Sequence, residues 1–354
     1  MGPSLSNATV HEVKQLDSSD LETVRAWDQF VLEHPQGTFF HRAAWQSVIA
    51  QQFKHKTYFL YVEHESKILA ILPLANVNSW LFGNSLSSLP FAVYGGILSV
   101  SKEAAAALEQ EAKLLAGRLA VSHLEFRNLG PSQNQWPTQD LYVTFRKEIL
   151  PTVDANLLAI PRKQRAMVRK GIKNDLTSVI DKDADRFFSL YADNVHRHGT
   201  PAMSKRYFKA LMTAFGSDCE VLTILSADGV ALSSVMSFYF RDEVLPYYAG
   251  DDEVARNLAA NDFKYWELMR RSCERGLKVF DFGRSKKETG SFSFKKNWGF
   301  EPTQLSYEYC LFKSQQIPQN NPNNPKYQLL IKTWRRLPIG VANWLGPFIV
   351  RNLG

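Results

Sequence analysis

Lysines follow aromatic residues in the segment FDFGRSKKETGSFSFKKNWGF, which occupies residues 280–300. Lys295 lies between Phe294 and Trp298, so aromatic surface could hold its ammonium partly away from water. Such an ammonium stabilises the oxyanion that forms when an amine attacks an ester. We therefore expect Lys295 to be catalytic and Arg284 to bind substrate. The alternative is a hairpin with outward-pointing lysines, since lysines are usually exposed.

A second candidate lies in VLPYYAGDDEVARNLAAND (residues 244–262), where the pattern predicts a strand, a bend and the start of a helix. A helix N-terminus presents free N–H groups that favour an anion or a polarised carbonyl. Backbone N–H groups near Gly250 could therefore share the oxyanion with the lysine. Asp251 is the candidate base for the attacking amine, and Asp252 is a weaker one. Both carboxylates could instead cap the turn that follows.

The third candidate is a cationic helix predicted in RKQRAMVRKGIK (residues 162–173), which contains no acidic residue. At 3.6 residues per turn, Arg162, Arg165 and Arg169 fall on one face. Like charges at this spacing destabilise an isolated helix, whereas a phosphate-bearing partner would bind them through charge-assisted bonds. A solvated charged face is the alternative.

These candidates must be positioned by a fold in which the second half of the chain repeats the first. Each half reads as a hairpin, a strand, a helix and a strand; the segment containing Tyr94-Gly95-Gly96 parallels that containing Tyr248-Ala249-Gly250. The repeat predicts a duplicated α/β chain, with domains over 1–150 and 151–315 and a basic, aromatic tail over 316–354. A chance match of short α/β patterns is the alternative.

Composition and cysteine spacing indicate which partners and which compartment to expect for this chain. A net charge of +7 over 354 residues favours anionic partners. The three cysteines lie far apart and show neither a disulfide nor a metal-binding spacing, and His196 and His198 have no evident third metal ligand. No signal peptide or membrane-spanning run is apparent. We therefore expect a cytoplasmic protein without a metal site.

Taken in order, the motifs resemble the FemAB-type branch of the GNAT superfamily. The segments that carry the resemblance are HPQGTFFHRAAW, LFGNSLSSLPFAVYGG, RKQRAMVRKGIK, HRHGTP, YYAGDD, FDFGRS and SFKKNWGF. They are most similar to bacterial FemAB-related proteins associated with exopolysaccharide and PEP-CTERM sorting loci. The resemblance implies an α/β (α+β) chain of two tandem GNAT-like domains, with mixed twisted sheets flanked by helices and a cleft in or beside the second domain.

The resemblance also implies acyl transfer. In better-known members an amino acid passes from aminoacyl-tRNA to an amine of a cell-wall precursor, and an F-K pair ahead of a glycine contributes. Phe294 and Lys295 match that pair, while Tyr247 or Tyr248 matches tyrosines that contact the precursor. Tyr94 occupies the corresponding place in the first repeat. The long helical-hairpin insertion of some tRNA-using members is missing here.

Coenzyme A is the other donor that the superfamily suggests. Its pyrophosphate is held by a Q/R-x-x-G-x-G/A loop, and the matching residues here are Arg256, Ala259 and Asn261. A methyl group at Ala259 replaces the glycine that lets backbone approach phosphate, which argues against coenzyme A. Asn261 could instead be an N-cap.

Three hypotheses follow. The first is direct acyl transfer, without a covalent enzyme intermediate, from aminoacyl-tRNA or acyl-CoA to a cell-envelope or exopolysaccharide precursor, with no DNA partner. The second is a coenzyme A-dependent N- or O-acyltransferase. The third is a non-catalytic protein at the inner face of an anionic membrane, suggested by cations mixed with Trp334, Trp344 and Phe348 in the tail. Packing of that tail on the second domain is the alternative.

Overall fold

The computed structural model describes residues 11–79, 83–130, 136–313, 315–317 and 325–352, the last range by its backbone alone up to residue 329. The chain forms two compact units. Unit 1 contains residues 1–138 and 306–317, and unit 2 contains 139–305 and 318–354. This division differs from the expected boundary at 150, because a strand over 142–148 belongs to unit 2. It also assigns residues 306–317 to unit 1, although 306–315 are expected in the second domain and 316–317 in the tail.

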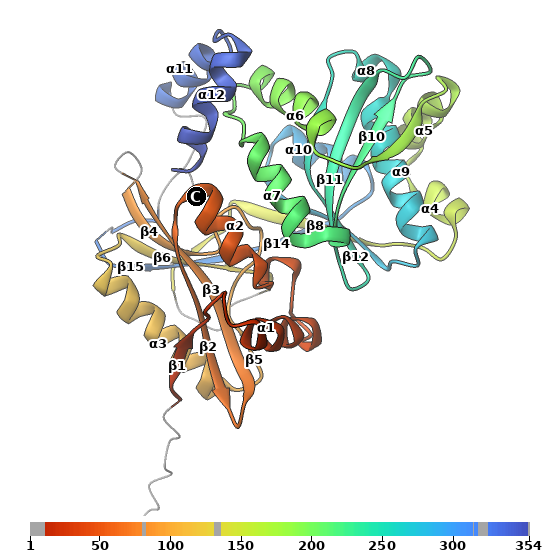
Figure 1. The fold of residues 1–354 in the computed structure, drawn as a ribbon. Coiled ribbons are helices and arrows are strands. Elements are labelled where there is room, and N and C mark those ends of the chain that lie inside the picture. The colour runs from red at the N-terminus through yellow and green to blue at the C-terminus, as the bar shows by residue number, and fades with distance from the viewer. Residues whose placement is uncertain (1–10, 80–82, 131–135, 314, 318–324, 353–354) are drawn as a thin grey trace, which may run out of the picture. The chain divides into compact units, whose positions relative to one another are not determined.

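Unit 1 is a mixed sheet with the strand order β1-β2-β3-β4-β6-β15-β7, and β5 pairs with β3 (Figure 1). Its elements are β1 (Val13–Gln15), α1 (Leu21–Glu33), η1 (Phe39–His41), α2 (Ala44–Phe53), β2 (Lys56–His64), β3 (Lys67–Ser79), β4 (Gly83–Ser88), β5 (Leu98–Ser99), α3 (Lys102–Arg118), β6 (His123–Asn128), β7 (Thr138–Gln139, at the boundary) and β15 (Ser306–Leu311). The alanine-rich face of α3 packs on apolar residues of β2, β3 and β6 to form one core.

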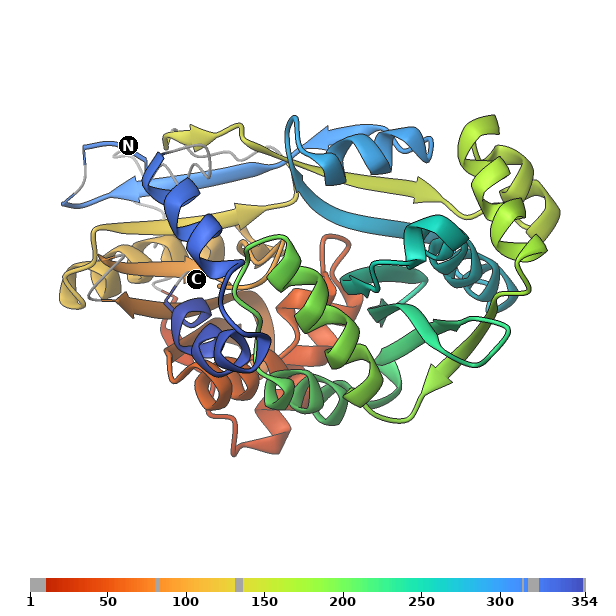
Figure 2. The same cartoon turned by 90° about the horizontal axis from the view of Figure 1, so that it is seen from above.

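Unit 2 is a mixed sheet with the order β14-β8-β13-β12-β11-β10-β9 (Figures 1 and 2). Its elements are β8 (Tyr142–Glu148), α4 (Val153–Ala159), α5 (Arg162–Lys173), β9 (Thr177–Asp181), α6 (Asp185–Arg197), α7 (Lys205–Phe215), η2 (Gly216–Asp218), β10 (Cys219–Leu225), β11 (Ala231–Phe240), β12 (Glu243–Asp251), α8 (Ala255–Leu258), α9 (Ala260–Glu274), β13 (Val279–Lys286), α10 (Gly290–Asn297), β14 (Pro302–Gln304), α11 (Pro325–Trp334) and α12 (Ile339–Val350).

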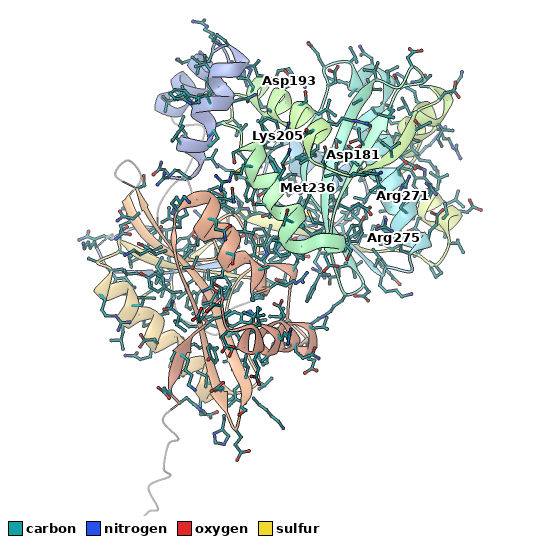
Figure 3. All side chains as sticks on the ribbon, in the orientation of Figure 1. Asp181, Asp193, Lys205, Met236, Arg271 and Arg275 are labelled. Carbon is teal, nitrogen blue, oxygen red and sulfur yellow. The ribbon has the colours of Figure 1, made fainter. Side chains whose placement is uncertain are left out.

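Helix α9 is the central helix of unit 2, and its position is fixed at both ends. Its apolar face joins the buried core with strands β8, β10, β11 and β13. Near its C-terminus, Arg271 donates to the hydroxyl of Ser178 at 2.8 Å and Arg275 to the carboxylate of Glu220 at 2.7 Å, which ties the helix to β9 and β10 (Figure 3). Near its N-terminus, a Cβ added to Gly171 of α5 would meet Phe263 at 2.7 Å, so these two helices pack closely.

The predicted repeat is present in both units. In unit 1 a helix (α3) connects the parallel strands β4 and β6, and in unit 2 a helix (α9) connects the parallel strands β12 and β13. One detail of the prediction is wrong. The segment that contains Tyr94 is expected to be the strand before the helix, but β4 ends at Ser88 and residues 89–97 form a loop after it. That loop is held by side chains of β6 and β15, since Arg127 donates to the carbonyls of Leu89 and Ala92 and Tyr307 to that of Val93.

The C-terminal tail packs on unit 2, as the docking alternative predicts. The ring nitrogen Nε2 of His196 lies 3.1 Å from the carbonyl oxygen of Trp334, and Arg335 donates to the carbonyl of His198 at 3.2 Å. Helix α12 lies beside α6 (Figures 1 and 2). Within the described residues, no helix has the length and apolarity needed to cross a bilayer.

Candidate active site

The sheet of unit 2 opens between its two parallel strands. Strands β12 and β13 pair only where Glu243 faces Val279 and Val244 faces Phe280. Over the rest of their described length, residues 245–251 and 281–286, no ladder pairing joins them. An interruption of this kind leaves strand backbone available to a ligand that enters the sheet.

A β-bulge on each strand accompanies the opening. On β12, Tyr248 pairs with Met236 and Pro246 with Ser237, so Tyr247 is the extra residue. On β13, two residues, Phe282 and Gly283, lie between pairs where β8 has only one. Bulges of this kind bend a strand and increase its twist, which separates it from its neighbour.

Gly283 lies within β13 and belongs to its bulge. Its φ of +63° lies in the left-handed region that glycine tolerates best. The fully buried Asp281 fixes this geometry: its Oδ1 accepts from the Gly283 N–H at 2.7 Å, and its Oδ2 accepts from Arg146 of β8 at 2.8 Å. Arg146 also binds Glu243, so one guanidinium connects β8, β13 and β12.

Lys295 projects onto this bulge from helix α10. Lys295 and Lys296 therefore lie on a helix, which Thr289 caps by accepting from the Phe292 N–H, and not in a hairpin, whereas Lys286 is the last residue of β13. The ammonium donates to the carbonyl oxygens of Phe282 at 2.6 Å and of Gly283 and Arg284 at 3.1 Å each. Because an ammonium has three N–H donors, binding a substrate oxyanion would require one carbonyl to be released.

The surroundings of Lys295 are aromatic, as predicted, although other rings provide them. Its Nζ lies 5.7 Å from the ring centroid of Phe145 and 5.8 Å from that of Phe282. Burial lowers the pKa of Lys295 to about 7, while nearby Asp281 opposes the shift and Arg284 adds to it. The amine can therefore exchange a proton near neutral pH. Phe294 lies in the adjacent cluster with Tyr265 and Trp298.

Asp251 lies at the far end of β12 and has a cationic partner. Its Oδ1 accepts from Lys264 of α9 at 2.8 Å and from the hydroxyl of Ser233, and Lys264 is fully buried. Lys295 binds carbonyl oxygens of β13 instead, so the two side chains predicted to be catalytic have separate partners. Asp252 accepts from the Val254 N–H at 2.9 Å, as a residue capping a turn would. The ion pair of Asp251 with Lys264 ties the end of β12 to α9.

The two predicted tyrosines lie in an aromatic cluster formed by β12, α6 and α7. The hydroxyl of Tyr248 lies 2.9 Å from that of Tyr207, and burial raises the pKa of both phenols well above its ordinary value. Both hydroxyls therefore stay protonated at neutral pH. Tyr247, at the bulge, packs against Tyr248 and Phe238. Gly250 permits close packing here, because an added Cβ would meet the backbone nitrogen of Tyr191 at 2.3 Å.

The N-terminus of α9 differs from a phosphate-binding loop. Ala259 has a φ of +61° and is the N-cap, without a side-chain hydrogen bond, so the expected alternative of Asn261 as N-cap is wrong. Asp262 places a carboxyl in the first helical turn, where it accepts from the Trp298 indole at 2.9 Å and competes with any bound anion. Arg256 is exposed on α8.

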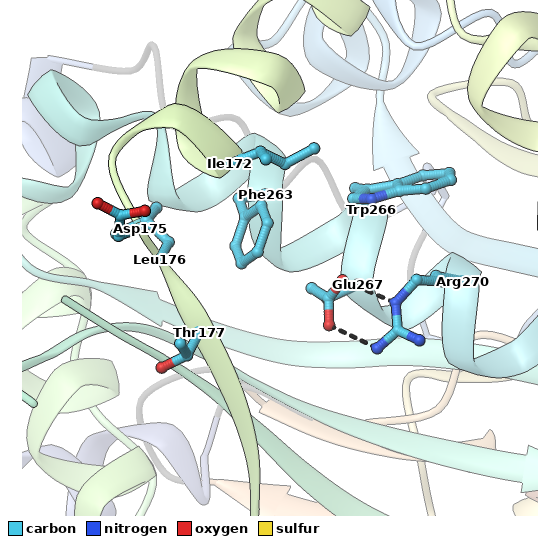
Figure 4. Close-up of a pocket in the computed structure, with 8 residues that line it drawn as sticks. All are labelled: Ile172, Asp175, Leu176, Thr177, Phe263, Trp266, Glu267 and Arg270. Atoms are coloured by element: carbon cyan, nitrogen blue, oxygen red, sulfur yellow. Dashed lines mark hydrogen bonds and ion pairs between the residues drawn. The ribbon is translucent and has the colours of Figure 1, made fainter. Parts of the chain in front are cut away.

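Helix α5 presents its cations to solvent. Arg162 and Arg169 are exposed, while Arg165 is half-buried and donates to the carbonyl of Leu158 at 2.9 Å. A pocket of about 420 Å³ lies between the end of α5 and α9 (Figure 4). Two carboxylates line it, and one of them, Glu267, is bound by Arg270 and Ser178. The pocket contains none of the predicted site residues.

Tyr94 is the predicted site residue that belongs to unit 1. It lines a pocket of about 750 Å³ together with Gly95, Gly96 and His41. His41 is fixed by Thr38 and by the Gly96 carbonyl, and burial lowers the pKa of its imidazole to about 4, so it is neutral at neutral pH. In the same unit, burial acts to raise the pKa of Glu125, but the Arg127 guanidinium outweighs burial and the pKa of Glu125 is lowered.

Sequence reasoning missed three residues that the structure connects to the predicted site: Asp281 at the bulge of β13, Lys264 beside Asp251, and Tyr207 beside Tyr248. Asp281 alternates with Phe280 and Phe282, and a lone acid between buried aromatics is a signal of a buried ion pair. Lys264 and Tyr207 sit in helical segments whose pattern does not indicate their partners.

A family model described as an acetyltransferase (GNAT) domain matches residues 162–296, which lie within unit 2 and run from α5 to α10. The match includes β12, β13 and the opening between them. No curated protein matches the chain by sequence.

Solved structures of other proteins have a similar fold along most of the chain. FemX is 15% identical with a TM-score of 0.64, and the match covers 90% of this chain and 100% of FemX. A tandem GNAT protein from the clavulanic acid biosynthesis pathway is 14% identical with a TM-score of 0.55, covering 87% of this chain and all of that one. L-PGS from Bacillus licheniformis is 11% identical with a TM-score of 0.53, covering 90% and 98%. The expected tandem GNAT fold is confirmed.

Proposed function

We propose that unit 2 is an acyltransferase domain and that the donor carbonyl binds in the opening between β12 and β13. The observation that carries this proposal is the coincidence of that opening, with a bulge on each strand, and the matched GNAT domain over residues 162–296. Strand backbone at an opening of this kind can hydrogen-bond a donor and align it for attack. Positioning alone removes about 7–11 kcal/mol at best from a bimolecular barrier.

The reaction is a direct transfer. The attacking amine or hydroxyl of the acceptor adds to the donor carbonyl, and the tetrahedral intermediate collapses with loss of the donor's leaving group. Lys295 stabilises the intermediate by exchanging one carbonyl partner for the oxyanion, or takes the proton of the attacking amine in its neutral form. Asp251, the other candidate base, would have to act while bound to Lys264.

The donor we favour is an aminoacyl ester, as in aminoacyl-tRNA. Ala259 and Asp262 both disfavour a diphosphate at the N-terminus of α9, where coenzyme A would place it. The exposed cations Arg162 and Arg169, with Arg165 beside them, suit a phosphate-bearing substrate. The acceptor we propose is an amine of a cell-envelope or exopolysaccharide precursor, which rests on the resemblance of the motifs to the FemAB-type branch.

The second candidate is a coenzyme A-dependent transferase, which the description of the matched domain favours. Calorimetry with acetyl-CoA separates the two donors. Binding in the micromolar range would support coenzyme A, whereas no heat together with protein-dependent deacylation of aminoacyl-tRNA would support the aminoacyl donor.

The matched pair Lys295→Ala and Lys296→Ala tests the site, because the second lysine is exposed on the same helix. We expect donor consumption to fall about 100-fold or more in the first variant and to stay near wild type in the second, which is the scale of a lost oxyanion donor. Full activity of the Lys295 variant would reject its catalytic role. Asp251→Asn, compared with Asp252→Asn, tests the base in the same assay.

A further inference from the structure

Helix α12 has one face that packs on unit 2. None of its twelve residues is charged. The buried residues Ala342, Gly346 and Val350 recur every four positions and form a single stripe. A Cβ added to Gly346 would meet the backbone oxygen of Ala202 at 2.7 Å, so the helix lies against the segment between α6 and α7.

The opposite face of α12 is apolar and exposed. Trp344 is 68% exposed and Phe348 56%, and their rings contact each other with centroids 5.9 Å apart. At about 100° per residue, Val341, Trp344 and Phe348 fall within an arc of about 60°. Ile339 is also exposed at the start of the helix. Large apolar side chains gathered in this way usually mark a binding surface.

Cations flank this apolar face on both sides in the sequence. Lys332, Arg335 and Arg336 precede α12 and Arg351 follows it, and all four are exposed. The whole segment from Tyr309 to Gly354 contains six lysines and arginines and no acidic residue. An uncharged aromatic helix with cations at both ends complements a surface that is apolar inside and anionic at its boundary.

We propose that the exposed face of α12, formed by Val341, Trp344 and Phe348, docks on an anionic phospholipid bilayer. Twelve residues at about 1.5 Å each give about 18 Å, short of the hydrocarbon core of about 30 Å, so the helix lies in the interface and does not span it. The indole and phenyl rings enter the headgroup region while the flanking cations bind lipid phosphates. The inference does not depend on the acyl-transfer proposal.

Helix α5 is the competing cationic surface of unit 2, but it lacks this combination. Val168 and Gly171 are buried, the latter against Phe263 of α9, and Ile172 is the one large apolar residue exposed among its described side chains. Its charges can attract an anion, yet it offers little apolar area to insert. The geometry therefore favours α12 as the bilayer contact.

Flotation of the full chain with vesicles tests the proposal. Wild-type protein should float with phosphatidylglycerol-containing vesicles and not with pure phosphatidylcholine vesicles, and 0.5 M salt should weaken binding because it screens the phosphate contacts. The double variant Trp344→Ser/Phe348→Ser should lose at least about tenfold in vesicle affinity, since it removes the inserting rings. Its matched control, Leu158→Ser/Val254→Ser, removes two exposed apolar residues elsewhere on unit 2 and should bind normally.

Charge reversal provides the second comparison. Lys332→Glu/Arg336→Glu and Arg162→Glu/Arg169→Glu change the net charge equally, but only the first pair flanks α12, so only the first should weaken binding. Loss of binding in the α5 pair alone would overturn the proposal, as would equal vesicle binding by the serine double variant and wild type. Sedimentation equilibrium tests whether a second copy of the chain binds this face instead. A wild-type dimer that the serine double variant converts to a monomer would show such self-association and would also overturn the bilayer proposal.

Discussion

At the scale of single residues, Lys295 has an unusual environment. Three carbonyl oxygens accept from its ammonium, which stabilises the charged form, whereas burial disfavours charge and lowers the pKa to about 7. Because the ordinary pKa of lysine is about 10.4, the unfolded chain binds this proton more tightly than the folded one between about pH 7 and 10. The folded state should therefore gain stability, relative to the unfolded one, as the pH rises through this window.

This rise of stability with pH gives a direct prediction for Lys295→Met, a substitution that keeps a side chain of similar length and removes the titrating amine. The free energy of unfolding of the wild type minus that of the variant should increase from pH 7 to pH 10. Urea denaturation at several pH values measures it, with Lys296→Met as the exposed control. A difference that stays flat over the range would mean that Lys295 titrates normally.

The sequence indicated several of these residues for partly correct reasons. An ammonium among aromatics was predicted at 295, yet the rings that surround it, Phe145 and Phe282, come from two different strands. Local sequence shows only neighbours along the chain, so it suggested Phe294 and Trp298. The partners of Asp251 and Tyr248 were not predictable, because Lys264 and Tyr207 reach them from helices whose register depends on tertiary packing.

At the scale of elements, Asp281 keeps the bulge of β13 and the opening in place. It binds the Gly283 N–H and the Arg146 guanidinium, and Thr144 of β8 lies at 3.4 Å. The order of strands and helices was readable from hydrophobic periodicity and turn residues. The bulges were not, because an extra residue in a strand is visible only against the register of its partner.

Asp281→Ala should destabilise unit 2 by about 3–5 kcal/mol, because it leaves a buried N–H unpaired and removes one of the two carboxylates that bind the partly buried Arg146. The exposed neighbour Asp242 provides the control, since Asp242→Ala removes a carboxylate of the same type from the surface. Urea denaturation followed by tryptophan fluorescence measures both variants. Equal midpoints for the two would show that Asp281 does not support the bulge.

Helix α12 contains an internal comparison of two glycines. A Cβ at Gly346 would collide with the backbone of Ala202, whereas one at Gly340 would meet nothing within 4 Å. Gly340→Ala should therefore stabilise α12 by about 0.5–1 kcal/mol, as alanine replaces glycine within a helix. Gly346→Ala should loosen it. Amide hydrogen exchange of residues 339–350 measures the stability of α12 in both variants. Faster exchange in the Gly340 variant, or unchanged exchange in the Gly346 variant, would contradict the packing of α12 on Ala202.

At the scale of the whole molecule, unit 1 depends on a strand, β15, that follows the 139–305 segment of unit 2 in the sequence. Strand β15 pairs with β6 over six residues, and the side chains of Tyr307, Glu308 and Tyr309 are buried there. The duplicated fold was predictable from the repeated order of elements. The pairing of β15 with the sheet of unit 1 was not predictable, because a hydrophobic pattern shows where a strand lies in the sequence and not which sheet it joins.

A chain that stops at residue 138 should therefore fail to fold, while the same chain joined through a flexible linker to residues 306–317 should regain a cooperative transition. The missing strand exposes β6 as an unpaired apolar edge, which favours aggregation. Circular dichroism and thermal unfolding compare the two proteins. The same linker followed by a scrambled 306–317 segment is the control, and cooperative unfolding of the 1–138 chain alone would contradict the expectation.

The position of β15 also sets an order of events at the ribosome. Residues 139–305 must be translated before the partner of β6 exists, and at about 5–20 residues per second this takes on the order of 10–30 s. Throughout that interval the nascent N-terminal segment carries an open sheet edge. The later half of the polypeptide can thus acquire its hydrophobic core first, and a chaperone that shields the waiting edge would raise the yield of native protein.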